Sequence, residues 1–422
     1  MMRHTHVLAG LLILFAAQTG LWGQSLTVNS SRFPQHIHAE LPAADCEPSA
    51  QYSLVDASDP QVRLPAQITP AVADDGTTDP SAYQLVASVP GTDQEASRRS
   101  FRLEKGSKEA GKEAFAFEKD DLSVELMEVV PDPARPIWRY NHGTIVKESV
   151  PESDPRRSRA CYIHPVWGMH GEILTDDFPQ DHYHHHGIFW TWPYVNVGGQ
   201  TYDLWMSSDI QQRFVKWLST ETGPVAAVMG VENGWFVGQQ QVATERVWVR
   251  TYRSEPDCRA VDLTLYIEAG DKPVTLKGRQ KKSYGGLTFR FDVSPRKDAT
   301  VRIPGKALGH GAGNQSGNPD LLNTPLPWAD LTTRIPGSPR RSGAAVFIHP
   351  RHPDYPPTWL TRTYGPLCVG WPGVESHTIQ PGESVKLQYR IWVHAEELDF
   401  KEIEQRYKAY RQSRAIEDLT AN

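Results

Sequence analysis

Short stretches in which apolar and polar residues alternate with a period of two recur along most of the chain. This period is typical of β-strands, because successive side chains of a strand point to opposite faces of the sheet. Segments rich in Gly, Pro, Asn and Asp separate the stretches and are expected to form turns. The clearest predicted strands are residues 52–55, 83–86, 244–252, 260–268 and 385–393.

One segment has the spacing of an amphipathic helix. Between residues 397 and 411, Leu398, Ile403 and Tyr407 share one face, and charged residues occupy the opposite face. Together with the strands, this segment predicts an all-β fold. We expect a large antiparallel β-sandwich with a small N-terminal β domain and a C-terminal helix.

The same pattern divides the 422 residues into two predicted domains. Residues 25–110 are expected to form a small N-terminal β-sandwich domain, with the polar run 95–112 acting as a linker. Residues 115–422 are expected to form the large β-sandwich domain. Within it, residues 304–343 are rich in Gly, Pro and Asn and are expected to form one long loop.

Composition narrows the class of protein. The formal net charge is -6 and the chain has no basic block, so the sequence gives no electrostatic support for nucleic-acid binding. Thirty-three prolines, thirty-two glycines and thirteen tryptophans are typical of a turn-rich β protein with an aromatic surface or cleft.

The N-terminus predicts export. Arg3 is followed by a short apolar run at 7–17 and by small residues, so residues 1–23 are expected to be a signal peptide. We expect a secreted or periplasmic protein with no membrane span in its mature form. Such a compartment permits disulfides between the four cysteines, although isolated buried thiols fit their wide spacing equally well.

Residues 181–187 contain four of the sixteen histidines together with Asp181. Imidazole binds metals, transfers protons near neutral pH and forms hydrogen bonds with polyols, so this stretch predicts a functional site. On a strand, His182 and His184 would point to one face and could bind a divalent metal with a nearby carboxylate. The alternative is a metal-free polar cleft in which the imidazoles contact a saccharide or another polar small molecule.

Acid–base chemistry at such a site needs a group that accepts a proton and another that donates one. Adjacent acids such as Asp120 and Asp121 are assigned to turn formation instead. The predicted catalytic residues are His182, His184, His185, Glu172 and Tyr284. The predicted substrate-binding residues are Asp177, Asp181, Lys282 and Arg290, together with Trp190 and Trp192, whose rings would stack on a sugar.

Several motifs also resemble those of a known family. They comprise Tyr162-Ile163-His164-Pro165, residues 171–179, Asp181-His182-x-His184-His185-x-Gly187, Tyr284-Gly285-Gly286-Leu287 and residues 381–383. The chain resembles, from about residue 115 onward, the soluble bacterial family labelled methane oxygenase PmoA. His186 departs from the arginine often found there. The family is similar to the β-supersandwich of galactose mutarotases and polysaccharide lyases, which implies a concave sheet that binds sugar while His, Tyr and acidic residues transfer protons.

These observations predict a secreted carbohydrate-active enzyme of the lyase or epimerase type. His185 or Tyr284 would remove a proton, and a second histidine or Glu172 would supply one. Two alternatives remain open at this point. The family label implies a metal-dependent oxygenase, and the aromatic content also fits a non-catalytic glycan-binding protein of the cell envelope.

Overall fold

The computed structural model describes residues 25–93, 97–106, 112–293, 298–309 and 321–414, so the expected signal peptide lies outside the described residues. The N-terminal part is a six-stranded antiparallel sheet that encloses its own apolar core, including Leu54, Leu85 and Phe101. In pairing order its strands are β1 (Ser25–Asn29), β6 (Arg98–Gly106), β3 (Gln51–Asp56), β4 (Arg63–Val72), β5 (Thr78–Val89) and β2 (Gln35–Pro42).

The rest of the chain is built on two nine-stranded sheets. The first sheet contains β24 (Leu321–Pro325), β27 (Thr358–Thr361), β28 (Pro366–Gly370), β21 (Gly286–Arg290), β13 (Ile188–Thr191), β12 (Tyr162–Val166), β9 (Arg135–Asn141), β8 (Ser123–Glu128) and β7 (Phe115–Lys119). The second contains β16 (Gln211–Glu221), β17 (Ala226–Val237), β18 (Gln240–Tyr252), β19 (Cys258–Ala269), β30 (Ser384–Ala395), β26 (Arg341–Ile348), β25 (Trp328–Arg334), β22 (Thr300–Ile303) and β23 (Lys306–Gly309).

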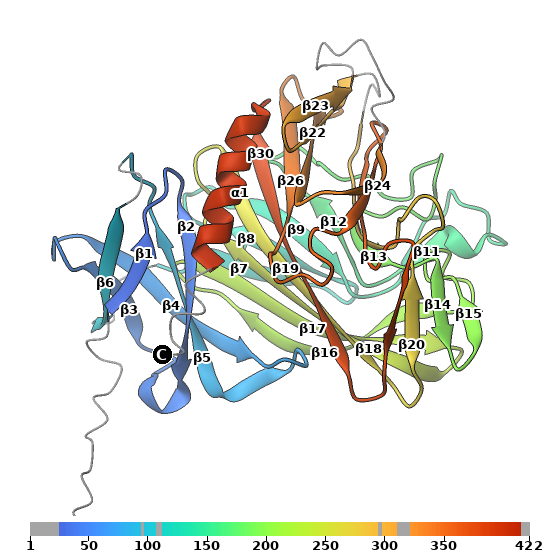
Figure 1. The fold of residues 1–422 in the computed structure, drawn as a ribbon, viewed down its shortest axis with the longest axis horizontal. Coiled ribbons are helices and arrows are strands. Elements are labelled where there is room, and N and C mark those ends of the chain that lie inside the picture. The colour runs from blue at the N-terminus through green and yellow to red at the C-terminus, as the bar shows by residue number, and fades with distance from the viewer. Residues whose placement is uncertain (1–24, 94–96, 107–111, 294–297, 310–320, 415–422) are drawn as a thin grey trace, which may run out of the picture.

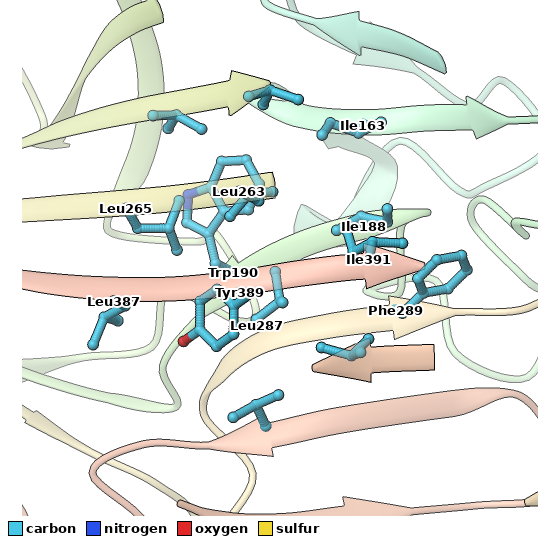
Figure 2. Packing of buried hydrophobic residues seen from close by; sticks show 14 of the residues in the cluster. Ile163, Ile188, Trp190, Leu263, Leu265, Leu287, Phe289, Leu387, Tyr389 and Ile391 are labelled. Atoms are coloured by element: carbon cyan, nitrogen blue, oxygen red, sulfur yellow. The ribbon is translucent and has the colours of Figure 1, made fainter. Parts of the chain in front are cut away.

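The two large sheets share one apolar core (Figure 2). Trp190 and Leu287 from the first sheet belong to the same buried cluster as Leu263, Leu265 and Leu387 from the second. Alternate residues of β19 and β30 point into this core, as a strand with one face on a sandwich interior requires. Burial of apolar surface between the sheets is therefore the main source of stability in this part of the chain.

Smaller elements complete the fold (Figure 1). The helix α1 (Phe400–Arg414) packs through Ile403 and Tyr407 on the outer face of the second sheet, against Trp392 and Phe347. The short elements are the four-stranded sheet β15 (Gln200–Tyr202), β14 (Tyr194–Val197), β20 (Val274–Lys277) and β29 (Ser376–Ile379), the pair β10 (Ile145–Val146) and β11 (Ser158–Arg159), and the 3-10 turns η1 (Ala43–Asp45) and η2 (Pro155–Arg157).

A buried polar contact joins the N-terminal sheet to the second large sheet. His38 on β2 lies 2.6 Å from the hydroxyl of Tyr252, and that hydroxyl donates to Asp262 at 2.7 Å. His36 stacks on the Tyr252 ring, with 3.8 Å between ring centroids. Because the contact between His38 and Tyr252 is buried, losing it would leave polar atoms without water, and it helps to fix how the two parts meet.

The predicted all-β sandwich with a single C-terminal helix is confirmed. Two finer predictions are wrong. The expected linker 95–112 contains β6, which pairs with β1 and β3 as an interior strand of the N-terminal sheet. The expected loop 304–343 contains all or part of β23, β24, β25 and β26, because strands with charged and small residues lack the clear alternation that identified the others.

The four cysteines are all free thiols, and Cys161, Cys258 and Cys368 are buried, so isolated thiols are what the fold contains. Among the described residues, the helices do not combine the length and apolar character needed to cross a bilayer.

A substitution at Trp192 tests how much the shared core contributes to the free energy of unfolding. This residue is fully buried, and its indole N–H donates to the carbonyl of Trp371 at 2.6 Å. Replacing Trp192 with Ala should lower the free energy of unfolding by about 3–5 kcal/mol, because a large cavity and an unpaired carbonyl remain. Denaturant titration measures this loss. The Leu322→Ala variant is the control: its side chain is 41% exposed, and its effect should stay within about 0.5 kcal/mol.

Candidate functional site

The histidine-rich stretch lies at the end of the first large sheet. It is not a strand, because the N–H of His182 donates to Pro179 O at 2.8 Å and the N–H of His185 donates to His182 O at 2.9 Å. These turns end where β13 begins, at Ile188. The prediction that His182 and His184 share a strand face is therefore wrong, since turn hydrogen bonds and Pro179 prevent regular alternation.

Three imidazoles nevertheless come together, and we call His182, His184 and His185 the imidazole cluster. The ring centroids of His182 and His185 are 4.7 Å apart, those of His184 and His185 are 4.8 Å apart, and those of His182 and His184 are 5.6 Å apart. Trp205 lies about 6 Å from two of these rings, and Tyr364 stacks on His182 with centroids 5.4 Å apart. Trp205 and Tyr364, which are distant in sequence, thus pack against the imidazole cluster.

Arg290, at the end of β21, adds a buried positive charge. Its guanidinium donates to Asp181 at 3.2 Å and to the Nδ1 atom of His185 at 3.4 Å. Asp176 lies 3.6 Å away and forms a second ion pair. The guanidinium also lies over the ring of Tyr364, 5.3 Å from its centroid. Arg290 therefore connects the imidazole cluster to the segment that carries Asp176.

The same segment lines a cavity of about 890 Å³. We call it the acidic pocket, because Glu172, Asp176, Asp177 and Asp292 contribute to its wall. The rest of its lining comes from the segment 164–175 and from the turn between β25 and β26, with the residues His164, His170, Gly171, Ile173, Thr175, Pro336, Gly337, Ser338, Pro339 and Arg340.

Asp177 is the most enclosed of these acids, with 13% of its side chain exposed. The hydroxyl of Tyr162 donates to one carboxylate oxygen at 2.9 Å, and His186 Nδ1 lies 2.9 Å from the other. Burial raises the pKa of Asp177 to about 6, while nearby His164 and the Tyr162 hydrogen bond act in the opposite direction. A carboxyl with this pKa changes protonation near neutral pH, as general acid–base catalysis requires.

Burial also shifts the pKa values of three neighbouring groups of the pocket. Burial raises the pKa of Asp292 to about 6, and the like charge of Asp176 raises it further. The pKa of Asp176 is also raised by burial, although Arg290 opposes this. Burial lowers the pKa of His164, so its imidazole is neutral at pH 7, with one nitrogen that donates a hydrogen bond and one that accepts.

Burial also governs the imidazoles. It lowers the pKa of His184 to about 3, with further contributions from the neighbouring His182 ring and from the positive charge of Arg156. The pKa values of His185 and His186 are well below the ordinary value, mainly for the same reason. The structure therefore holds these rings in their neutral form at physiological pH.

Among the described residues, no three His, Cys, Asp or Glu side chains are placed to bind one metal ion. His182 and His184 are adjacent, but their rings meet edge to face, and Asp181, which lies 3.3 Å from His182 Nδ1, also pairs with Arg290. The predicted divalent metal site is therefore not assembled by this arrangement, and we derive no chemistry through it.

Several other predicted site residues lie outside both the imidazole cluster and the acidic pocket. Trp190 and Trp192 are fully buried in the shared core, so the prediction that they stack on a sugar is wrong. Tyr284 is separated from the imidazoles by Trp205, on which its ring packs at 4.8 Å. Lys282 is exposed in the turn that precedes β21.

Glu172 lines the acidic pocket rather than the imidazole cluster. It accepts hydrogen bonds from the Ser342 hydroxyl and from the N–H of His170. The side chain thereby ties the segment 164–177 to the second large sheet. Among the predicted catalytic residues, it is the one that the structure places in the pocket.

Three residues of the site were not predicted from the sequence. His164 lies in the middle of β12, directly before Pro165, and a polar residue within a short strand gives no clear local signal of a site. Asp292 follows Arg290 by two residues and is close enough to a predicted site residue to have been considered. Tyr364 gives no local signal, because it reaches His182 only through the folded sheet.

The fold and the site thus define an all-β sandwich protein with a pocket of protonatable carboxyl groups at one end of a sheet. The chain belongs to a family of unknown function, DUF6807, whose model matches residues 132–408. The match includes both the acidic pocket and the imidazole cluster. No curated protein matches the sequence.

Asp177 should make the stability of the protein depend on pH. Its folded pKa of about 6 lies above the ordinary value of 3.8, so the folded state favours the protonated form. The stabilisation is fully present below pH 3.8 and is lost as the pH rises through 6. Between pH 4 and 7, the unfolding free energy of the wild type should therefore fall relative to Asp177→Asn, by up to about 3 kcal/mol. Denaturant titrations at several pH values measure this.

Asp120→Asn is the matched control. Hydrogen bonds from Leu122 and Ser123 lower the pKa of Asp120, so its contribution is lost only when the pH falls below about 4. Its difference from the wild type should be constant between pH 4 and 7. A constant difference for Asp177→Asn as well would contradict the assignment of a raised pKa to Asp177.

Proposed function

We propose that this protein is a carbohydrate-active enzyme that transfers protons to and from a hydroxylated substrate bound in the acidic pocket. The observation that carries the proposal is Asp177, a largely buried carboxyl group on the wall of an open cavity, with a pKa of about 6. Perturbed carboxyl groups inside concave pockets are typical of acid–base catalysts.

The chemistry of the pocket favours a saccharide as the substrate. Carboxylates and a neutral imidazole form hydrogen bonds with hydroxyl groups, and several such groups line this cavity. Its volume of about 890 Å³ is within the range of small-molecule sites. The motifs resemble those of a family that is similar to the sugar-binding β-supersandwich proteins, which supports the same substrate class. The predicted signal peptide supports a location outside the cytoplasm.

The proposed step is of the lyase or epimerase type. The ionised Asp177 removes a proton from the carbon next to a carbonyl of an oxidised sugar, and the electron pair moves toward the carbonyl oxygen. His164, which also lines the pocket, donates a hydrogen bond from its neutral imidazole to the carbonyl oxygen on which the charge develops, and solvent supplies the proton that returns to carbon. Return of a proton to carbon gives epimerisation, and loss of a β-substituent gives elimination.

Replacing Asp177 with Asn should lower kcat by about 10²–10⁴-fold, because the amide cannot accept the substrate proton. The measurement is turnover of a panel of oligosaccharides and keto-glycosides, followed by chromatography and by exchange of substrate hydrogen with deuterated water. Exchange detects proton removal even where no net product accumulates. Absence of exchange and of product for every substrate, with the fold intact, would contradict the proposal.

Two further variants separate catalysis from a general effect on the pocket. Tyr162→Phe keeps the carboxyl group but removes a hydrogen bond that lowers its pKa, so the pH profile of kcat/KM should move to higher pH. Lys216→Ala alters an exposed residue outside the pocket and should leave turnover unchanged. Saccharide binding that is tight in the wild type and in Asp177→Asn, without exchange in either, would identify a binding protein instead.

A further inference from the structure

Arg290 is buried and is fixed both through its backbone and through its guanidinium. Only 3% of the side chain is exposed, and the residue does not line the acidic pocket. Its backbone N–H donates to Gly187 O at 2.7 Å, and its carbonyl accepts from the N–H of Asp176 at 3.1 Å. The backbone of Arg290 thus lies between the end of the histidine-rich stretch and the segment that carries Asp176.

The guanidinium is oriented by two carboxylates. Asp181 lies 3.2 Å from one terminal nitrogen, and Asp176 lies 3.6 Å from the same nitrogen. A planar guanidinium that is fixed on one side points its remaining N–H groups in set directions. The other terminal nitrogen is thereby aimed at the Nδ1 atom of His185, 3.4 Å away.

This contact has only one chemically consistent form. Every hydrogen-bonding atom of a guanidinium is a donor, so the Nδ1 atom of His185 must accept and cannot carry a hydrogen. We propose that Arg290 is a positioning residue that fixes His185 as the neutral tautomer with its hydrogen on Nε2. His185 is then a hydrogen-bond donor only through Nε2, and a protonated His185 would lose the contact with Arg290 and face a buried positive charge.

The assignment alters the roles expected for both residues. Arg290 acts through His185 instead of contacting the substrate, and a base at His185 would have to use the Nδ1 atom that already faces the guanidinium. His185 is therefore a hydrogen-bond donor, through Nε2, within the imidazole cluster. Its use in turnover rests on the proposed function, whereas the tautomer itself does not, so failure of one leaves the other standing.

The experiment is nuclear magnetic resonance of the full chain with ¹⁵N-labelled histidine at neutral pH. Two-bond correlations between ring hydrogens and ring nitrogens distinguish the two neutral tautomers and the protonated ring. The His185 signals are assigned by their absence from the His185→Gln spectrum. The wild type should give the pattern of the Nε2–H tautomer. The pattern of the Nδ1–H tautomer or of a protonated ring would overturn the inference. This measurement uses the wild type and does not depend on whether a variant of Arg290 folds.

Three variants test whether Arg290 is the group that fixes the tautomer of His185. Arg290→Met removes every donor and should give His185 a mixture of tautomers, whereas Arg290→Lys keeps a donor and should preserve the Nε2–H pattern. Arg156→Met is the matched control, because Arg156 places its positive charge near His184 and packs on Tyr183. It should leave the His185 pattern unchanged. An unchanged pattern in a folded Arg290→Met would show that another group fixes the tautomer.

Discussion

The site depends on the antiparallel pairing of β13 with β21. Ile188 pairs with Phe289 in this register, so the last turn of the histidine-rich stretch meets Arg290 at the same end of the sheet. The segment 164–177 reaches the same end because Thr175 bridges to Phe291 and Asp177 bridges to His186. A shift of one residue would turn Arg290 to the opposite face of the sheet and separate it from both carboxylates.

A single physical effect gives the two halves of the site opposite properties. Removal from water disfavours charge, so it raises the pKa values of Asp177 and Asp292 and lowers those of His184 and His185. Both groups of residues are thereby moved toward their neutral forms. The guanidinium of Arg290 forms ion pairs with Asp176 and Asp181 and lies between the two groups of residues.

The sequence was sufficient to predict the fold class, because an alternation of two survives wherever a strand has one face on the core. It also located the region of the site, since Asp177, Asp181, Arg290 and the histidines lie within one end of a sheet. It could not assign the faces of β13. Trp190 and Trp192 both lie in the shared core, but Phe189 before them and Thr191 between them are buried as well, and a strand buried on both sides gives no sign of which face meets solvent.

The remaining parts of the site could not be predicted from short stretches of sequence, because they depend on contacts between distant segments. The pocket is closed on one side by the turn between β25 and β26, a region that composition alone presented as a loop. Arg340 of that turn contacts His170 at 3.0 Å, and Ser342 donates to Glu172, so the second large sheet supplies one wall and the first supplies the other. A pocket shared in this way exists only when both sheets are packed on their common core. The apolar residues that build the sandwich therefore also determine the distance between the two walls, and the chemistry of the carboxyl groups depends on that packing.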